Sequence, residues 1–379
     1  MLPLEGIRVL SMAEQLPGPY CTMLLGDLGA EVILLERPGT GDPARMIPAF
    51  LSILGRNKKS ITVNLKSKKG REICYKLAAR SDVFLEGFRP GVMKRLGADY
   101  ESIRIVNPRI IYCSISGYGQ DGPYQDRPGH DLSYQGTAGL LAAFIESGNF
   151  PAGPGVAIAD LSSAMFATIG IIAALRARDK FGIGQYVDIS MTDGLVSWMS
   201  AALGLYFNMG SSLQAVGREP AYGVFQAGDG KYLTLSIAHE DHFWRNLCHA
   251  IGKDKLAELS REQRHERKDE LVTVLRNVLA TKTREEWLEL LTKADVPCGP
   301  VYTLEEVASD PQILHRGMII EVDGPEGKLK QVAHPIKFSE TPAQIRMLLP
   351  KLGEHTEEIL TSLGYSLNEI EGLRKERAI

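Results

Sequence analysis

The 379-residue sequence contains few cysteines, and their spacing argues against two classes of site. Only five occur, at positions 21, 74, 113, 248 and 298, with no Cys-x-x-Cys pair and no histidine at zinc-ligand spacing. A disulfide framework usually needs an even set of cysteines, and a structural zinc site needs closely spaced Cys or His ligands. The sequence therefore predicts neither disulfides nor a bound metal.

Excess charge and long apolar runs are also lacking. A net charge of -3 and a pI near 6.3 give no overall attraction to nucleic acid or to an anionic membrane. The N-terminal residues lack the basic segment and apolar core of a secretory signal. The most apolar run, Leu161 to Leu175, is short and rich in Ser and Ala for a membrane span. We therefore expect a cytoplasmic protein with no nucleic-acid partner and no membrane partner.

Strand and helix patterns alternate through the first part of the chain. Gly6 to Met12 and Ala30 to Glu36 are typical of buried strands, and Pro19 to Leu28 between them has helical spacing. The alternation continues to Arg109–Ser116. Strands that alternate with helices predict an α/β fold, with a parallel sheet covered on both faces.

The pattern changes after residue 220. Tyr222 to Gln226 and Lys231 to Ile237 flank Ala227–Gly230 as a hairpin, and charged amphipathic helices follow. These features predict a smaller α+β domain. We expect a large domain over residues 1–200, a linker over 201–220, the small domain over 221–325 and a return to the large domain over 326–379.

A literal Gly-x-Gly-x-x-Gly motif occurs at Gly117–Gly122, directly after a predicted strand. The residues that follow include Pro123 and Pro128, and they cannot open the helix whose N-terminus would hold a pyrophosphate. The dinucleotide interpretation is therefore rejected. These glycines instead indicate a loop at the carboxyl edge of the sheet, where open α/β folds bind ligands.

Asp160 is the leading candidate for chemistry. It precedes the apolar run, at the expected start of a buried helix. The helix dipole would keep the carboxylate ionised while apolar neighbours remove water, which favours a nucleophile or base. The alternative is a plain N-cap, a common role for Asp. A second polar cluster, Arg127–Asp131, which contains His130, favours the chemical interpretation.

Basic residues follow several of the predicted strands. They include Arg37, Lys66, Arg89 and Arg95. Because the carboxyl ends of parallel strands share one edge, these side chains suit a phosphate-bearing cofactor or substrate. The alternative for each is a solvated surface charge.

The sequence resembles family III CoA-transferases, which include formyl-CoA transferase and their relative α-methylacyl-CoA racemase. The ordered matches include Leu35–Gly39, Arg56–Ser60, Gly87–Gly91, Gly184–Asp188 and Pro297–Val301. The resemblance implies a Rossmann-like large domain built from both ends of the chain, a smaller domain, and an interlinked homodimer.

The resemblance also implies roles for individual residues. Asp160 matches the catalytic aspartate of the family. Coenzyme A or acyl-CoA would be bound as substrate, with contacts from Arg37, Lys66, Phe88 and Arg95. The partners would be an acyl-CoA and a small carboxylic acid.

Two chemistries remain open within this resemblance. Residues Gly155–Leu161 are similar to the transferase form, in which the aspartate attacks the thioester and a covalent aspartyl intermediate carries CoA. His130, Asp160 and Glu240 also match the racemase, in which His and Asp exchange the α-proton and Glu supports the His. We favour the transferase because the segment around Asp160 resembles it. A non-catalytic acyl-CoA-binding protein is a third, weaker alternative because the aspartate is intact.

Overall fold

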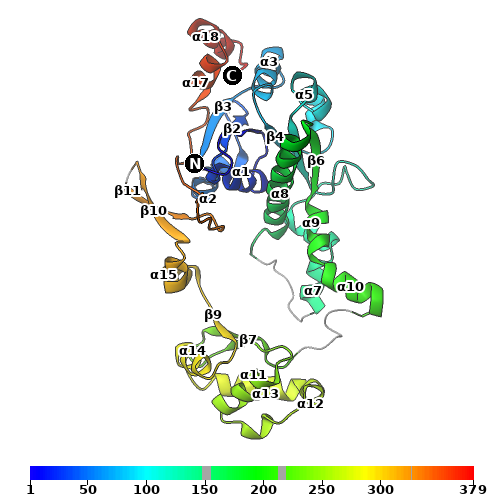
Figure 1. The fold of residues 1–379 in the computed structure, drawn as a ribbon, viewed down its shortest axis with the longest axis vertical. Helices are drawn as coiled ribbons and strands as arrows, with labels where there is room; N and C mark the ends of the chain where they lie inside the picture. The colour runs from blue at the N-terminus through cyan, green and yellow to red at the C-terminus, as the bar shows by residue number, and fades with distance from the viewer. Residues whose placement is uncertain (147–154, 212–218, 326) are drawn as a thin grey trace. The chain divides into compact units, whose positions relative to one another are not determined.

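The computed structural model describes residues 1–146, 155–211, 219–325 and 327–379 (Figure 1). It divides into two compact units, one formed by Met1–Ser200 with Ile320–Ile379 and the other by Ala201–Ile319. Residues 212–218 of the expected linker lie outside the described residues.

A parallel sheet forms the centre of the first unit. Its strands are β1 (Arg8–Ser11), β2 (Glu31–Glu36), β3 (Lys58–Thr62), β4 (Val83–Glu86), β5 (Ile111–Ser116) and β6 (Gln185–Ser190). They are ordered β3-β2-β1-β4-β5-β6, and every adjacent pair is parallel. The predicted α/β fold with a parallel sheet is confirmed. The central strands β4 and β5 are buried along their whole length, because helices cover both faces of the sheet.

Helices cover both faces of this sheet. The core of one face contains side chains of α3 (Lys68–Ala78), α4 (Val92–Leu96), α5 (Tyr100–Val106), α17 (Thr356–Ser362) and α18 (Leu367–Lys375). The core of the other contains side chains of α1 (Pro17–Asp27), α6 (Asp131–Thr137), α8 (Ile158–Phe181) and α9 (Met191–Trp198). Figure 1 shows α1 and α8 lying along the sheet and the C-terminal helices close to α3. The two ends of the chain therefore build one core.

The remaining elements of this unit are shorter. They are η1 (Pro43–Met46), α2 (Pro48–Leu54), α7 (Leu140–Glu146) and most of the hairpin formed by β10 (Ile319–Gly324) and β11 (Gly327–Val332). Helices α2 and α5 were not predicted from the sequence.

The strand order places a topological switch between β1 and β4. From β1 the chain moves outward to β2 and β3, and then it returns to β4 on the opposite side. The loops after β1 and β4 consequently diverge, which leaves a crevice at their carboxyl ends. The Gly117–Gly122 motif follows β5, so it does not occupy the phosphate-binding turn after β1.

Three helix predictions need correction. Helix α8 begins at Ile158 with Ala157 at the N-cap, so Asp160 is neither the first helical residue nor the cap. The sequence pattern predicts one helix from Asp131 to Ile145, but the structure has two, separated near Gly139, whose φ of +82° suits glycine. The pattern also predicts one helix from Gly194 to Met209, but α9 ends at Trp198 and α10 spans Ser200–Met209.

Helix α8 is also longer than the expected apolar run. Its 24 residues are long and apolar enough, by length and composition, to cross a membrane. Half of its most apolar window is buried inside the protein, however, as is common for the core helix of a soluble protein.

The second unit has its own sheet and core. Strands β7 (Tyr222–Gln226), β8 (Tyr232–Ser236) and β9 (Cys298–Val301) are antiparallel in that order. The helical elements are α11 (Asp241–Ala250), η2 (Asp254–Leu256), α12 (Arg261–Glu266), α13 (Lys268–Leu279), α14 (Arg284–Lys293), α15 (Leu304–Ser309) and α16 (Pro311–His315). The core includes Trp244, Leu247 and Trp287. Strand β9 differs from the sequence pattern, which predicts a loop-rich stretch from Pro297 to Lys337.

In the first unit, a buried ion pair between Arg56 and Asp27 holds the returning C-terminal segment in place. Arg56 and Asp27 are 0% and 1% exposed, and two guanidinium nitrogens of Arg56 lie 3.0 and 2.6 Å from the Asp27 carboxylate oxygens. Arg56 also donates to the Gln331 side chain and to the Val332 carbonyl oxygen. Since all of these groups have left water, removing either charge leaves its partner unpaired.

We therefore predict that Arg56→Met lowers the free energy of unfolding by about 3 to 5 kcal/mol. Urea unfolding at fixed protein concentration would measure the loss. The double variant Arg56→Met with Asp27→Leu should recover much of it, because no buried charge then remains. A loss below about 1 kcal/mol in the single variant would contradict this assignment.

Candidate active site

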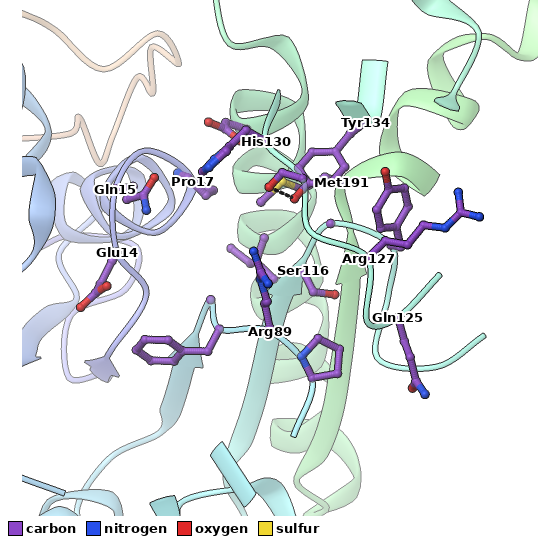
Figure 2. A pocket seen from close by; sticks show the side chains of 18 residues that line it. Glu14, Gln15, Pro17, Arg89, Ser116, Gln125, Arg127, His130, Tyr134 and Met191 are labelled. Atoms are coloured by element: carbon purple, nitrogen blue, oxygen red, sulfur yellow. Dashed lines mark hydrogen bonds between the residues drawn. The ribbon is translucent and has the colours of Figure 1, made fainter. Parts of the chain in front are cut away.

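A cavity of about 270 Å³ lies at the topological switch (Figure 2). Its walls come from the segments after β1 and β4, from the end of β5 and the loop beyond it, and from the start of α6. Asp160 of α8 and Met191 of α9 complete the lining. All of these residues belong to the first unit.

Asp160 lies in the first turn of α8, where it is half-buried. Burial raises the pKa of its carboxyl group to about 6, and the charge of Asp131 adds to the rise. No cation among the described residues offsets these effects. The carboxylate is therefore ionised near neutral pH while it remains poorly solvated, a combination that suits a nucleophile or a base.

Asp131 holds the first turn of α8 in place. Ala157, at the N-cap, provides no side-chain hydrogen bond, and one Asp131 carboxylate oxygen instead accepts the N–H groups of Ala159 at 2.7 Å and Asp160 at 3.4 Å. The other oxygen accepts from the Gln135 side-chain amide at 2.5 Å. A residue of α6 thereby caps α8 and fixes the position of Asp160.

His130 immediately precedes this cap and lines the same cavity as Asp160. It occupies the N-cap position of α6 with extended backbone, but its side chain makes no capping hydrogen bond. The exposed imidazole is therefore available to a ligand. The structure places His130 and Asp160 on one cavity, and no hydrogen bond joins their side chains.

Tyr134 packs the loops together behind these residues. A methyl group added at Gly117 would lie 2.3 Å from the Tyr134 ring, and one at Gly129 would lie 2.7 Å from it, so only glycine fits at either position. The Tyr134 hydroxyl donates to the Gly129 carbonyl at 2.6 Å. Burial raises its pKa, and the nearby charges of Asp160 and Arg89 act on it with opposite sign.

The turn after β1 is strained. Gln15 has a φ of +65°, and its N–H donates to both Asp42 carboxylate oxygens at 3.0 and 3.1 Å. Glu14 beside it lines the cavity, and burial raises its pKa to about 7 although Arg37 opposes the rise. A left-handed non-glycine residue is costly and is found at functional sites more often than elsewhere.

The four residues expected to contact CoA have different positions. Phe88 is half-buried and lines the cavity. Arg37, Lys66 and Arg95 do not line it; Arg37 pairs with Glu14 at 3.2 Å, and Lys66 and Arg95 are exposed. They follow β2, β3 and β4, respectively, at the same edge of the sheet. Their contacts with CoA stay predictions.

Glu240 belongs to the second unit. It occupies the N-cap position of α11, and its carboxylate accepts the Ala238 N–H at 3.1 Å. Backbone hydrogen bonds, first with its own N–H, lower its pKa. Its expected support of His130 stays a prediction.

Among the residues that the structure describes, no three His, Cys, Asp or Glu side chains come together as metal ligands.

Several lining residues were not recognised from the sequence. Glu14, Gln15, Ser116 and Tyr134 are all part of the cavity. Glu14 and Gln15 follow the first predicted strand, so the rule that ligands bind at the carboxyl ends of strands could have identified them. Ser116 ends a strand in the same way. Tyr134 had no signal, because its position depends on loop packing.

Comparison with known proteins gives a consistent result. The sequence profile of CoA-transferase family III matches residues 4–356. The chain is 35% identical to succinyl-CoA:glutarate CoA-transferase of Mus musculus, over 98% of this chain and 89% of that one. It is also 35% identical to acetyl-CoA:oxalate CoA-transferase of Acetobacter aceti, over 89% of each chain.

A solved structure agrees with this result. The crystal structure of a CaiB/BaiF family protein from Brucella suis superposes with a TM-score of 0.85 at 32% identity, covering 96% of this chain and 99% of that one. A match of this extent in sequence and in fold shows that the chain belongs to CoA-transferase family III.

Proposed function

We propose that the protein moves CoA from an acyl-CoA to a small carboxylic acid through a covalent intermediate on Asp160. The observation that carries this proposal is the half-buried Asp160 carboxylate, which lines a cavity at the sheet switch and forms no ion pair with any described residue. A carboxylate that is ionised yet poorly solvated is an effective nucleophile toward a thioester.

The reaction is balanced without an added acid or base. Asp160 attacks the thioester carbonyl, and the C–S bond breaks. CoA departs as the thiolate, and a mixed anhydride of Asp160 and the donor acid remains. The thiolate attacks the Asp160 carboxyl carbon and releases the donor acid, which gives an aspartyl-CoA thioester. The acceptor carboxylate attacks the same carbon and expels the thiolate, which gives a mixed anhydride of Asp160 and the acceptor. The thiolate then attacks the acceptor carbonyl of this anhydride, which restores Asp160 and forms the new acyl-CoA.

The protein supplies position and electrostatics to these steps. Asp131 fixes the first turn of α8, whose helix dipole favours the ionised form of Asp160. His130 offers a ring N–H at the same cavity, where charge develops on a carbonyl oxygen. Arg37, Lys66, Phe88 and Arg95 would bind CoA at the carboxyl edge of the sheet.

The names of the relatives suggest the acceptor. Two of them act on glutarate and oxalate, which are dicarboxylic acids. Together with the arginine side chains that line the cavity, this supports a small dicarboxylic acid as the acceptor.

One observation favours a second chemistry. His130 and Asp160 line one cavity, as an acid and base pair for racemising a 2-methylacyl-CoA would require. The two functions differ in whether Asp160 forms a bond to the substrate.

Incubation with an acyl-CoA alone should therefore add mass covalently at Asp160, and hydroxylamine should trap the activated carboxyl group. Intact-protein and peptide mass spectrometry would locate the adduct. Asp160→Asn should abolish it, while His130→Ala should reduce transfer only modestly.

Racemase chemistry would give different products. Deuterium from solvent would enter the α-carbon of a 2-methylacyl-CoA, and no adduct would form. Deuterium incorporation without a gain of mass, across a panel that includes succinyl-CoA, would overturn the transferase proposal.

The pKa of Asp160 also sets a pH dependence. Because the nucleophile must be ionised and its pKa is raised to about 6, kcat/KM should fall as the pH drops through about 6. Asp131→Asn removes a negative charge but keeps an oxygen for the Ala159 N–H, so the midpoint should move to lower pH. A midpoint near that of an ordinary aspartate, about 3.9, would contradict this assignment.

A homodimer is also proposed. Met165, Ile169 and Ile172 form an exposed apolar stripe on α8, with 45%, 60% and 37% exposure. Helix α10 has no buried residue in the isolated chain, and its apolar residue Phe207 is 73% exposed. Exposed apolar surface of this kind indicates a partner, and the family resemblance implies a second, interlinked copy.

Sedimentation should accordingly give twice the 41.6 kDa of one chain, and dilution should not produce monomer because interlinked subunits separate only on unfolding. Ile169→Asp should lower the yield of folded dimer, whereas a change at exposed, polar Lys293 should not. A stable folded monomer in the unmodified protein would refute the proposal.

A further inference from the structure

Arg89 is a cation of the cavity with no partner of its own. It follows β4 and lines the cavity, and Figure 2 shows its side chain extending toward the centre of the lining residues. Neither a hydrogen bond nor an ion pair links it to any residue that the structure describes. The other arginine of the lining, Arg127, is already engaged, with its guanidinium 3.4 Å from the centre of the Tyr124 ring.

Arg89 lines the same cavity as Tyr134 and Asp160. Burial is the main cause of the raised pKa of Tyr134; the charge of Asp160 adds to the rise, and the charge of Arg89 opposes it. The pKa of Asp160 itself responds only to burial and to Asp131. Arg89 therefore shares the cavity with Asp160 without contributing to the shift of its pKa, and its positive charge is available to a ligand.

Ser116 provides an independent observation on the next strand. It is 5% exposed and lines the cavity, and its Oγ has no hydrogen-bond partner among the described residues. Ser114, on the same strand and face, is satisfied because it accepts from the Tyr186 hydroxyl at 3.0 Å. A buried hydroxyl without a partner costs stability, so its retention at a cavity indicates a ligand oxygen.

Arg89 and Ser116 lie near the carboxyl ends of two neighbouring strands. Glu86 of β4 pairs in register with Ser114 of β5, so the chain reaches Arg89 and Ser116 within three residues beyond one rung of the sheet. A planar guanidinium fork and a hydroxyl donor together match the two oxygens of a carboxylate.

We propose that Arg89 and Ser116 form the subsite for the second carboxylate of the acceptor acid. The inference rests on the proposed transferase function, and it assigns acceptor selectivity to two named residues. One carboxylate of a dicarboxylic acid reaches the carbon on Asp160, and the other is held by Arg89 and Ser116.

A phosphate of CoA has similar chemistry, but the geometry favours the acid. The three cations expected to bind CoA lie outside the cavity lining, whereas Arg89 and Ser116 belong to the lining with Asp160. The experiment described next distinguishes a carboxylate of the acceptor from a phosphate of CoA.

The test compares straight-chain diacids from oxalate to adipate with their half-amides, in which a neutral amide replaces one carboxylate. With saturating succinyl-CoA, the unmodified enzyme should favour at least one diacid over its half-amide. Arg89→Gln should reduce this ratio of kcat/KM values by about tenfold to a hundredfold, and Ser116→Ala by up to about tenfold. Arg89→Lys should retain part of the preference because it keeps the charge but not the fork.

Matched controls use nearby residues. Lys94→Gln removes the same charge from an exposed position outside this cavity, and Ser114→Ala removes a hydroxyl that already has a partner. Neither should change the ratio. Arg95→Gln should raise the KM for acyl-CoA and leave the ratio unchanged.

Calorimetric binding of diacid and half-amide to the free dimer gives a readout that does not need the covalent chemistry. Asp160→Asn should lose the adduct yet keep the preference for the diacid, so failure of the mechanism and failure of the subsite are distinguishable. The proposal is overturned if the unmodified protein shows no preference in either assay. It is also overturned if Arg89→Gln leaves the ratio intact and raises only the KM for acyl-CoA.

Discussion

The contact between the Asp131 carboxylate and the first turn of α8 is the interaction on which the cavity depends. It satisfies two N–H groups of α8 that have no partner within the helix. It also raises the pKa of Asp160, because a second negative charge lies nearby. One carboxylate thus holds the residue proposed as nucleophile in position and adds to the effect of burial on its pKa. His130 gains its place on the cavity from the same turn.

The sheet order provides the space in which this pair acts. Chain reversal between β1 and β4 separates the loops after those strands, and the end of β5 forms the adjacent wall. Apolar packing on both faces keeps water from the sheet and partly from the cavity. That packing explains why burial is the largest cause of the raised pKa of Asp160, and equally of Glu14.

Helix α8 contributes both to the cavity and to the proposed dimer surface. Its inner side packs on the sheet through small residues such as Ala164 and Ala167, which allow close approach, and its outer side exposes an apolar stripe. The helix that presents Asp160 thus also carries part of the proposed dimer surface. Alteration of the proposed dimer surface should therefore also disturb the catalytic turn.

Sequence alone determined the elements that depend on local pattern. Apolar runs identified the strands of the parallel sheet, and their alternation with helices identified the sheet itself. The position of Asp160 before a buried helix made it the leading candidate for chemistry. The start of α8 was misplaced by two residues because its cap comes from Asp131, far away in sequence. Only the tertiary structure decided which groups remain unpaired. Ser116 looks ordinary in the sequence, and Arg89 is one of several basic residues that follow strands. Folding brings both to one cavity, where neither has a hydrogen-bond partner among the described residues.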